Sequence, residues 1–294
     1  MFPSALCTKT ALLLVSRFHF TLVVTSPIYL PKNKGATLRG GFGNALKAVC
    51  CTVPHTACSD CPRFRVCAYP TLFETPLPIA ATRMVKGNAI PRPFVIEPPL
   101  GEKMCYAPGD VMTLSLVLIG KASASLPYFV RAFEVLGKEG LGMGRGHFKV
   151  ETVQLLETEK EPVVECQNIT LHFLTPTRIV VKGQAKKDLD FPLLFRTLLR
   201  RIENLRAFHG VNHDGALDPP VHAEAVQVIS SSLKWIEQER YSSRQKQNMP
   251  QDGFVGKISF EGNLGSFLPY LSLGELVHVG KGATFGMGRF EINT

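Results

Sequence analysis

Apolar and polar positions recur along the chain in two series with the same order of elements. In the first series, strand-like alternation over about 17–25, 90–98, 110–119 and 146–156 is interrupted by helical periodicity over about 36–49 and 126–137. In the second, strands are predicted over about 168–175, 222–235, 253–261 and 285–293, and helices over about 191–208 and 266–278. Each series follows the order β-α-β-β-α-β, so the sequence predicts an α+β fold of two tandem ferredoxin-like domains.

A charged segment that contains proline, residues 157–166, separates the two series. Such a composition is typical of a linker between domains. We therefore predict one domain over 1–157 and a second over 166–294. The first domain would also carry a Cys-rich insertion at 50–70, where helical periodicity stops.

The apolar start of the chain, residues 1–26, predicts a short helix followed by the first strand. A cleaved leader is the alternative. The longest clean apolar run extends only from Ala11 to Val15, far less than the ~20 residues that cross a bilayer. We therefore expect a cytoplasmic protein without a membrane span.

Two glycine-rich phrases close the two halves. Residues 140–150 read GLGMGRGHFKV and residues 282–292 read GATFGMGRFEI. The openings of the halves also correspond, with LVVTSPIYLP at 22–31 beside LHFLTPTRIV at 171–180. These matches predict that the chain contains two copies of one fold.

The glycine-rich phrases also suggest anion binding, because small residues let successive backbone N–H groups approach a phosphate chain. Arg145 adds a positive charge to the first loop, and Lys281 and Arg289 add charge to the second. The alternative is that both are tight loops that only shape the ends of the domains.

Composition and charge favour a globular protein with a polyanionic partner. The chain has 294 residues, 45% of them apolar, a net charge of +9 and a pI near 9.2. The stretch from Arg178 to Arg206 holds eight Lys or Arg against three acidic residues. Such a surface suits phosphates and would make binding depend strongly on salt, although a solvated helix face would have the same composition.

Five of the eight Cys lie between positions 50 and 67, where the spacing predicts a metal site. Cys58-x2-Cys61-x5-Cys67, with Cys51 or Cys50 as the fourth ligand, offers four thiolates in one short insertion. Four thiolates complete a tetrahedral zinc site, or alternatively hold a four-iron four-sulfur cluster. Because no position is left open, we expect a structural role and no catalytic metal.

Four segments resemble the RAMP superfamily of CRISPR systems, and within it the endoribonucleases that process precursor CRISPR RNA. They are LPKNKGATLRGGFG at 30–43, the Cys block ending in CAYPTLFE at 67–74, RYSSRQ at 240–245 and HVGKGATFGMGRFEI at 278–292. The resemblance implies a CRISPR repeat RNA partner, metal-independent cleavage and a 2′,3′-cyclic phosphate product. It leaves other CRISPR effector subunits open as partners, as well as the oligomeric state.

Two alternatives accompany this interpretation. The first is a non-catalytic RAMP subunit that only holds CRISPR RNA in an effector complex. The second is a metabolic enzyme with ferredoxin-like domains, which would not explain the paired glycine-rich loops beside a Cys block. The first gains weight because many relatives carry a His in or just after the first helix, and 36–49 contains none.

Attack by a ribose 2′-hydroxyl requires a base, an acid and positive charge on the phosphorane. The candidates for proton transfer and orientation are His55, His209, His213, Tyr29 and Lys34, and His278 enters the second loop. Tyr241 is expected to stack on a base, and the cations and glycines to contact phosphates. The residues expected to bind RNA are Arg39, Arg145, Arg196, Arg200, Arg240, Tyr241, Arg244, Gly280, Lys281, Gly282, Gly286, Gly288 and Arg289.

Overall fold

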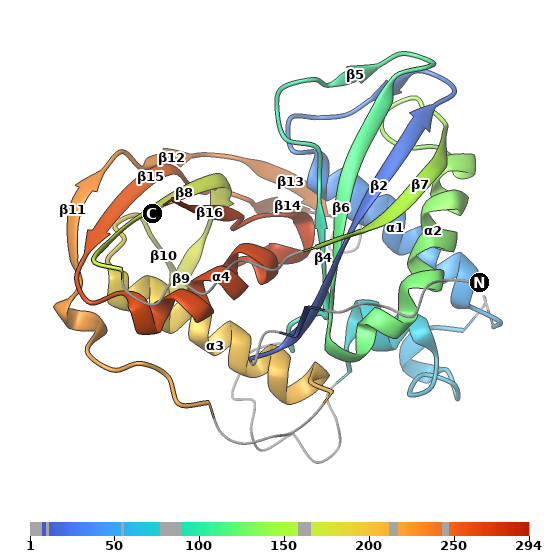
Figure 1. The fold of residues 1–294 in the computed structure, drawn as a ribbon. Coiled ribbons are helices and arrows are strands. Elements are labelled where there is room, and N and C mark those ends of the chain that lie inside the picture. Colours follow the sequence, from blue (N-terminus) through green and yellow to red (C-terminus); the bar gives the residue numbers. More distant parts are fainter. Residues whose placement is uncertain are drawn as a thin grey trace.

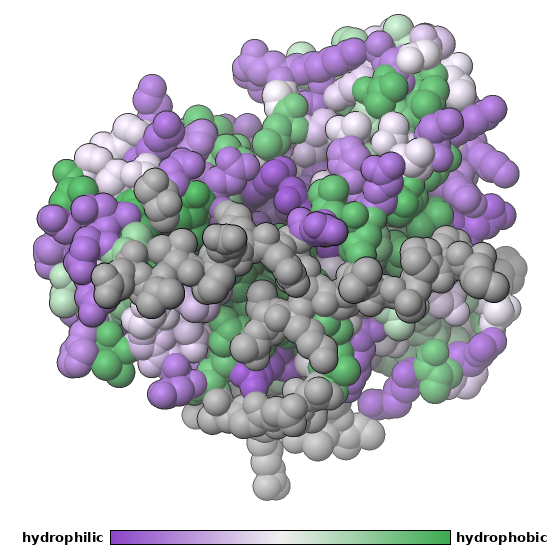
Figure 2. Space-filling view, in the orientation of Figure 1, coloured by the Kyte–Doolittle hydropathy of each residue, from purple (hydrophilic) through white to green (hydrophobic). Residues whose placement is uncertain are grey.

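The computed structural model contains two antiparallel sheets that lie side by side, each with two helices packed on one face (Figure 1). It describes residues 8–9, 12–53, 56–76, 90–157, 166–211, 217–242 and 247–293. On the face drawn in Figure 2, hydrophilic and hydrophobic side chains are interspersed outside the grey atoms. The antiparallel sheets and the helices that cover them confirm the α+β prediction.

The first sheet has the ferredoxin-like strand order β4-β6-β2-β7. Its central strand, β2 (Leu14–Val24), pairs with β6 (Val111–Ile119) on one side and β7 (Phe148–Leu156) on the other. The edge strand β4 (Phe94–Glu97) pairs with β6, and β1 (Thr8–Lys9) pairs with the start of β2.

The second sheet repeats this order as β11-β15-β8-β16. Strand β8 (Asn168–Thr177) lies between β15 (Gly253–Glu261) and β16 (Phe290–Asn293). The strand predicted over 222–235 consists of two pieces, β11 (Gln227–Ser231) and β12 (Lys234–Ile236), which both pair with β15. Both sheets therefore have the arrangement that the duplicated pattern predicted.

Three small two-stranded pairs extend from these sheets. They are β3 (Ile28–Tyr29) with β5 (Cys105–Tyr106), β9 (Ile179–Val181) with β10 (Gln184–Lys186), and β13 (Glu239–Ser242) with β14 (Gln247–Pro250). Strand β3 follows β2 and pairs with β5, which precedes β6, whereas β9 and β10 form a hairpin directly after β8. The third inserts between β12 and β15 and has no counterpart in the first half.

Two helices, α1 (Lys34–Cys50) and α2 (Leu126–Glu139), cover one face of the first sheet. Aromatic residues fill the space between them and the sheet, with the ring of Phe42 5.1 Å from that of Phe133. In the second domain, α3 (Phe191–His209) and α4 (Leu268–Val277) have the same role. Asp190 caps α3 by accepting a hydrogen bond from the Leu193 N–H at 2.7 Å.

The opposite face of the first sheet packs against the second domain. Val95, Val117 and Ile119 are fully buried and belong to the same apolar cluster as the inward faces of α3 and α4. This contact places α4 beside β6, and the 283–285 turn that follows α4 beside β4. Burial of apolar side chains thus fixes the second domain on the first and positions the residues between them.

The start of the chain differs from the prediction. The described residues of this segment, 8–9 and 12–16, contain no helix, and Thr8 and Lys9 pair with Val15 and Leu14 as a short strand. Leu14 and Val15 continue the two-residue alternation of β2, with Val15 buried, so the apolar run joins the sheet. The domain bounds at 157 and 166 stay predictions, because the linker between them lies outside the described residues. In the described parts of the chain, no helix has the length and apolar character that crossing a membrane requires.

Candidate functional site

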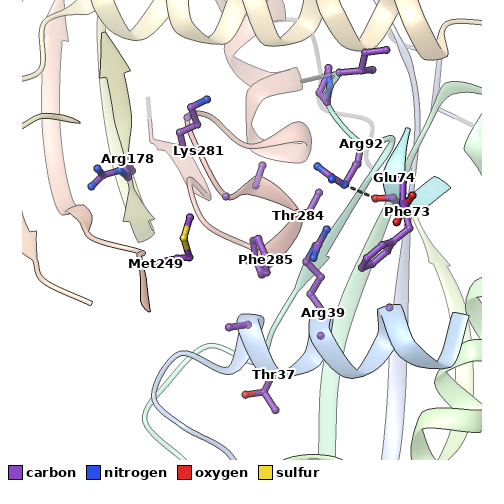
Figure 3. Close-up of a pocket in the computed structure, with 18 of the residues that line it drawn as sticks. Thr37, Arg39, Phe73, Glu74, Arg92, Arg178, Met249, Lys281, Thr284 and Phe285 are labelled. Carbon is purple, nitrogen blue, oxygen red and sulfur yellow. Dashed lines mark hydrogen bonds between the residues drawn. The ribbon is translucent and has the colours of Figure 1, made fainter. Parts of the chain in front are cut away.

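A cleft of about 1340 Å³ lies where the two domains meet. One wall is α1 of the first domain, and the facing wall comes from α3 and the glycine-rich segment 278–289, called here the second loop. The segment 90–92, which leads into β4, lies between these walls (Figure 3). Residues far apart in the sequence therefore share one cavity.

The cleft is strongly cationic. Among its described lining residues, seven Lys or Arg face two carboxylates, those of Glu74 and Glu239. The seven cations are Arg39, Lys47, Arg92, Arg178, Arg200, Arg201 and Lys281. A groove lined by one sign of charge concentrates anions, so its chemistry suits a phosphate chain.

Arg39, on the cleft side of α1, is held between two aromatic rings. Its guanidinium carbon lies 4.3 Å from the centroid of Phe73 and 4.5 Å from that of Phe285 (Figure 3). Phe73 belongs to the first domain and Phe285 to the second loop. The cation–π contacts therefore connect the domains and keep the charge at the cleft.

Three more arginines are fixed by specific contacts. Arg92 donates from Nε to the Phe73 carbonyl at 2.5 Å, and Arg178 pairs with Asp252. Arg201 donates from Nε to the Val277 carbonyl at 2.8 Å. Burial lowers the pKa of Arg201 to about 10, which still leaves it charged at neutral pH.

The first half of the second loop faces the cleft, from Gly280 to Phe285. The Lys281 N–H donates to the Arg178 carbonyl at 2.8 Å, which brings the loop against β9. Gly280 and Gly282 have φ angles of 84° and 80°, and a Cβ at Gly280 would lie 2.5 Å from the Arg178 oxygen. Glycine is required at these positions, which also lets a ligand approach the backbone.

The other half of the loop packs against protein. A Cβ at Gly286 would lie 2.3 Å from Pro98, and one at Gly288 would lie 1.8 Å from the Val279 oxygen. Arg289 is only 17% exposed and lies 3.8 Å from a carboxylate oxygen of Glu97. Gly286, Gly288 and Arg289 are not among the described lining residues of the cleft.

His278 and Glu97 form a buried link between the domains. His278 Nε2 lies 3.1 Å from Glu97 Oε1, and its Nδ1 lies 3.0 Å from the Met287 oxygen. Arg17 donates to the other Glu97 oxygen from Nε at 3.0 Å. Burial raises the pKa of Glu97, but His278, Arg17 and Arg289 overcome this effect and lower it to about 2. His278 is fully buried in this interface.

The two glycine-rich loops correspond through their backbone contacts. The alignment that these contacts give differs from the one that would superpose the shared GMGR letters. In the first loop, 140–147, the Met143 N–H donates to the Tyr29 carbonyl at 3.0 Å, as Lys281 does to Arg178. Phe148 and Phe290 then begin β7 and β16. Met143 therefore corresponds to Lys281, and the second loop is four residues longer. Arg145 has no cationic counterpart and donates to the Glu139 carbonyl at 3.1 Å.

The structure separates the proposed catalytic residues. Lys34 is 2% exposed and donates from Nζ to the Gly101 carbonyl at 2.6 Å, and burial lowers its pKa. His209 Nε2 lies 2.8 Å from the Pro91 oxygen, and burial lowers the pKa of His209 too. Tyr29 is 46% exposed beside the first loop. His55 and His213 lie outside the described residues.

The remaining predicted RNA contacts are spread over the second domain. Arg200 lines the cleft, whereas Arg196, one helical turn earlier, is exposed and does not. In the hairpin β13–β14, Arg240 and Tyr241 pair through the backbone with Met249 and Asn248. Glu239 and Met249 of this hairpin line the cleft, and Arg244 lies outside the described residues.

The cysteines of the insertion surround one small pocket of about 30 Å³, lined by Cys50, Cys51, Cys58, Cys61 and Cys67. Nevertheless, no three His, Cys, Asp or Glu side chains are placed to hold a metal ion anywhere in the described ranges. Cys67 Sγ instead lies 3.9 Å from the Cys50 oxygen. The metal-site prediction therefore stays a prediction.

Sequence reasoning missed several cleft residues, namely Lys47, Phe73, Arg92, Arg201 and Phe285. No local pattern marks Arg92, which reaches the cleft only through the packing of 90–92 between the domains. Phe285 could have been noticed as an apolar residue inside a glycine-rich loop. Arg201 adjoins the predicted Arg200, but its bond to the Val277 carbonyl at the end of α4 depends on tertiary structure.

Solved structures of RAMP and Cas6 proteins share this fold of tandem ferredoxin-like domains. A structure described as a RAMP protein binding different RNA substrates has this fold, with a TM-score of 0.54, 10% identity, and coverage of 95% of this chain and 100% of that chain. The Thermus thermophilus Cas6 (TTHB231) product complex gives a TM-score of 0.60 at 16% identity, covering 95% and 99%.

The sequence comparisons agree with this class. Residues 12–174 match the family model AF_1859_N, described as an N-terminal domain, and because this is more than half of the chain, the protein belongs to that family. Residues 171–290 match the model of the CRISPR-associated endoribonuclease Cas6. The matches support a CRISPR-associated RAMP-type endoribonuclease that processes repeat RNA. An uncharacterized protein of Archaeoglobus fulgidus is 26% identical over 290 residues, covering 90% of this chain and 93% of its own.

Proposed function

We propose that this protein binds CRISPR repeat RNA in the cleft between its domains and cleaves it there without a catalytic metal. The observation that carries the proposal is the excess of seven cations over two carboxylates among the described lining residues. These cations come from both domains, so a bound strand would contact α1 and the second loop at once. The Cas6 match over 171–290 supports the same substrate.

In the proposed reaction, the ribose 2′-oxygen attacks the adjacent phosphorus and loses its proton to a base. The bond from phosphorus to the 5′-oxygen breaks, and that oxygen takes up a proton. The products are a 2′,3′-cyclic phosphate and a free 5′-hydroxyl. Arg39 and Lys281, on facing walls, suit the extra negative charge of the phosphorane, since cations held in place stabilise charge that develops in the transition state.

His55 is the histidine that we propose as the base. Its chain neighbours Ala57, Cys58 and Ser59 line the cleft. Lys34 is bonded to the Gly101 carbonyl and His209 to the Pro91 carbonyl, and neither side chain is among the described lining residues of the cleft, so a structural role suits them better. Tyr29 lines a different pocket.

The test is cleavage of labelled repeat RNA in the presence of EDTA. We expect one cut that survives EDTA and stops when the nucleotide at the cut carries a 2′-deoxy sugar. His55→Ala should abolish the cut while leaving RNA affinity intact, and His222→Ala, an exposed residue outside the cleft, serves as the matched control. Cleavage that requires a divalent cation, or that proceeds on the deoxy substrate, would contradict the mechanism.

The alternative is a subunit that binds CRISPR RNA without cutting it. It is favoured by one observation: none of the described lining residues of the cleft is a histidine. Tight binding of repeat RNA with no cleavage, in the presence or absence of divalent cations, would support this alternative and exclude the nuclease.

We also propose a structural zinc ion, or alternatively a four-iron four-sulfur cluster, in the cysteine pocket. Five thiols around one pocket have the donor chemistry that either group requires. Cys51, Cys58, Cys61 and Cys67 would hold the group, with Cys50 as the alternative to Cys51. Bound there, it would tie the insertion to the end of α1.

Elemental analysis tests this site. The purified protein should contain about one zinc, or about four irons with matching sulfide, per chain. Cys61→Ser should lose most of the metal, whereas the exposed Cys105→Ser should keep it. A metal-free wild type, or equal metal in both variants, would contradict the assignment.

A further inference from the structure

A second pocket, of about 500 Å³, lies beside the first glycine-rich loop. The loop and the chain around Tyr29 form its walls. Pro31, Thr37 and Gly41 line both this pocket and the cleft, so the two cavities adjoin across the start of α1. A strand lying in the cleft could thus continue into this pocket.

The pocket occupies the place in the first domain that the cleft-facing edge of the second loop occupies in the second. Tyr29 and Met143 form an isolated antiparallel bridge, as Arg178 and Lys281 do. A Cβ at Gly142 would lie 2.3 Å from the Tyr29 oxygen. Similarly, a Cβ at Gly280 would lie 2.5 Å from the Arg178 oxygen. The two sites therefore share one backbone geometry.

Their side chains differ in chemistry. Where the second domain presents two cations, Arg178 and Lys281, the first presents an aromatic ring and a thioether. Tyr29 is 46% exposed and Met143 is 77% exposed, so both side chains are accessible from the pocket side of the loop. Gly144, next in the loop, has no atom within 4 Å of an added Cβ, so the space above the loop is open.

We propose that Tyr29 and Met143 form a subsite for one unpaired base of the RNA whose phosphate chain lies in the cleft. A ring and a thioether cannot neutralise phosphate, but both pack well on the π-face of a base. The duplicated site thus binds backbone in the second domain and a base in the first. This inference rests on the proposed function, because it takes the same RNA as ligand.

An abasic scan tests the subsite. A non-cleavable 2′-deoxy repeat RNA is prepared with an abasic residue at each single-stranded position in turn, and its affinity for wild type and Tyr29→Ala is measured. We expect one position at which base removal weakens wild-type binding about 5- to 100-fold. Tyr29→Ala should weaken binding of the intact RNA equally and be insensitive to base removal at that position, whereas Tyr29→Phe should match wild type.

Tyr128→Ala provides the matched control, since Tyr128 is 45% exposed but lies on α2 outside both cavities. The salt dependence of binding should not change in Tyr29→Ala, because no charge is removed. The subsite would be overturned if Tyr29→Ala bound the intact RNA as tightly as wild type. It would also be overturned if, at every abasic position, the loss from base removal added to the loss from Tyr29→Ala. Neither result would affect the proposed function. Failure of the wild type to bind repeat RNA would instead overturn the proposed function.

Discussion

Two charged side chains of the first domain hold the second loop: Glu97 at its two ends and Arg39 in its interior. Arg39 packs on the ring of Phe285, and Glu97 contacts His278 and Arg289. The part of the loop that carries Lys281 is therefore fixed with respect to α1. Since a transition state is stabilised best by groups that are already in position, these contacts connect packing to the proposed chemistry.

Two substitutions of Arg39 should distinguish the effect of its charge on cleavage from the effect of its position between the two rings. We expect Arg39→Ala to slow cleavage about 100-fold, because a fixed cation is lost from the phosphorane. Arg39→Lys should recover only part of this loss, since an ammonium group cannot stack its plane between two rings. Single-turnover cleavage at saturating protein measures the effect, and Arg196→Ala should stay within about twofold of wild type because Arg196 does not line the cleft. Full activity in Arg39→Lys would show that the rings do not matter.

The Glu97 network predicts a dependence of stability on pH. The pKa of Glu97 falls from its ordinary value of 4.5 to about 2 on folding, so its contribution to the free energy of unfolding is present above pH 4.5 and is lost as the pH falls towards 2. The full contribution is on the order of 3 kcal/mol. Thermal unfolding should find Glu97→Gln less stable than wild type at pH 7, with a difference that narrows below pH 4.5. The exposed Glu151→Gln is the control, and a constant difference would contradict the assignment.

At the scale of elements, the glycines of α1 have different roles. A Cβ at Gly35 would lie 1.9 Å from the Phe285 oxygen, and one at Gly43 would lie 2.3 Å from the ring of Phe73. Gly41 meets a side-chain methyl of Leu136 on α2 at 2.7 Å. Gly40 alone among these four meets nothing within 4 Å, although it lines the cleft. Packing explains three of the glycines, and the role that we propose for Gly40 is to let the RNA strand approach the helix.

Alanine substitutions distinguish these roles. Gly40→Ala should raise the free energy of unfolding by roughly 0.5–1 kcal/mol through helix propensity, yet weaken RNA binding by crowding the strand. Gly43→Ala should instead destabilise the protein, because Phe73 would have to move. Chemical denaturation and RNA affinity, measured on both variants, give the comparison. Unchanged affinity in Gly40→Ala would place the RNA away from α1.

Element positions were largely predictable from sequence, and loop equivalence was not. Periodicity located α1 to α4 within two residues of their observed ends, because each helix buries one face. The repeated GMGR phrase suggested the wrong register, since equivalence is set by backbone contacts such as those of Met143 and Lys281. Among the described residues 12–16 the predicted short helix is absent and β2 already begins at Leu14, because apolar content alone does not distinguish a strand from a helix.

At the scale of the whole molecule, the cleft exists because an apolar interface joins the domains. Burial of Val95, Val117 and Ile119 against α3 and α4 places the second loop opposite α1. Sequence indicated a basic protein and named Arg39, Arg200 and Lys281. It could not show that these three share a cavity from which Arg196 and Arg289 are absent, since this depends on how the domains meet.

The most direct test of the RNA-binding cleft is the salt dependence of affinity for non-cleavable 2′-deoxy repeat RNA. A plot of the logarithm of the dissociation constant against the logarithm of the salt concentration should be linear. Its slope is proportional to the number of phosphates that the protein neutralises. We expect Arg200→Ala and Lys281→Ala each to lower the magnitude of this slope by about 0.7 to 1, while Arg196→Ala leaves it unchanged. Equal slopes in all four proteins would contradict binding in the cleft.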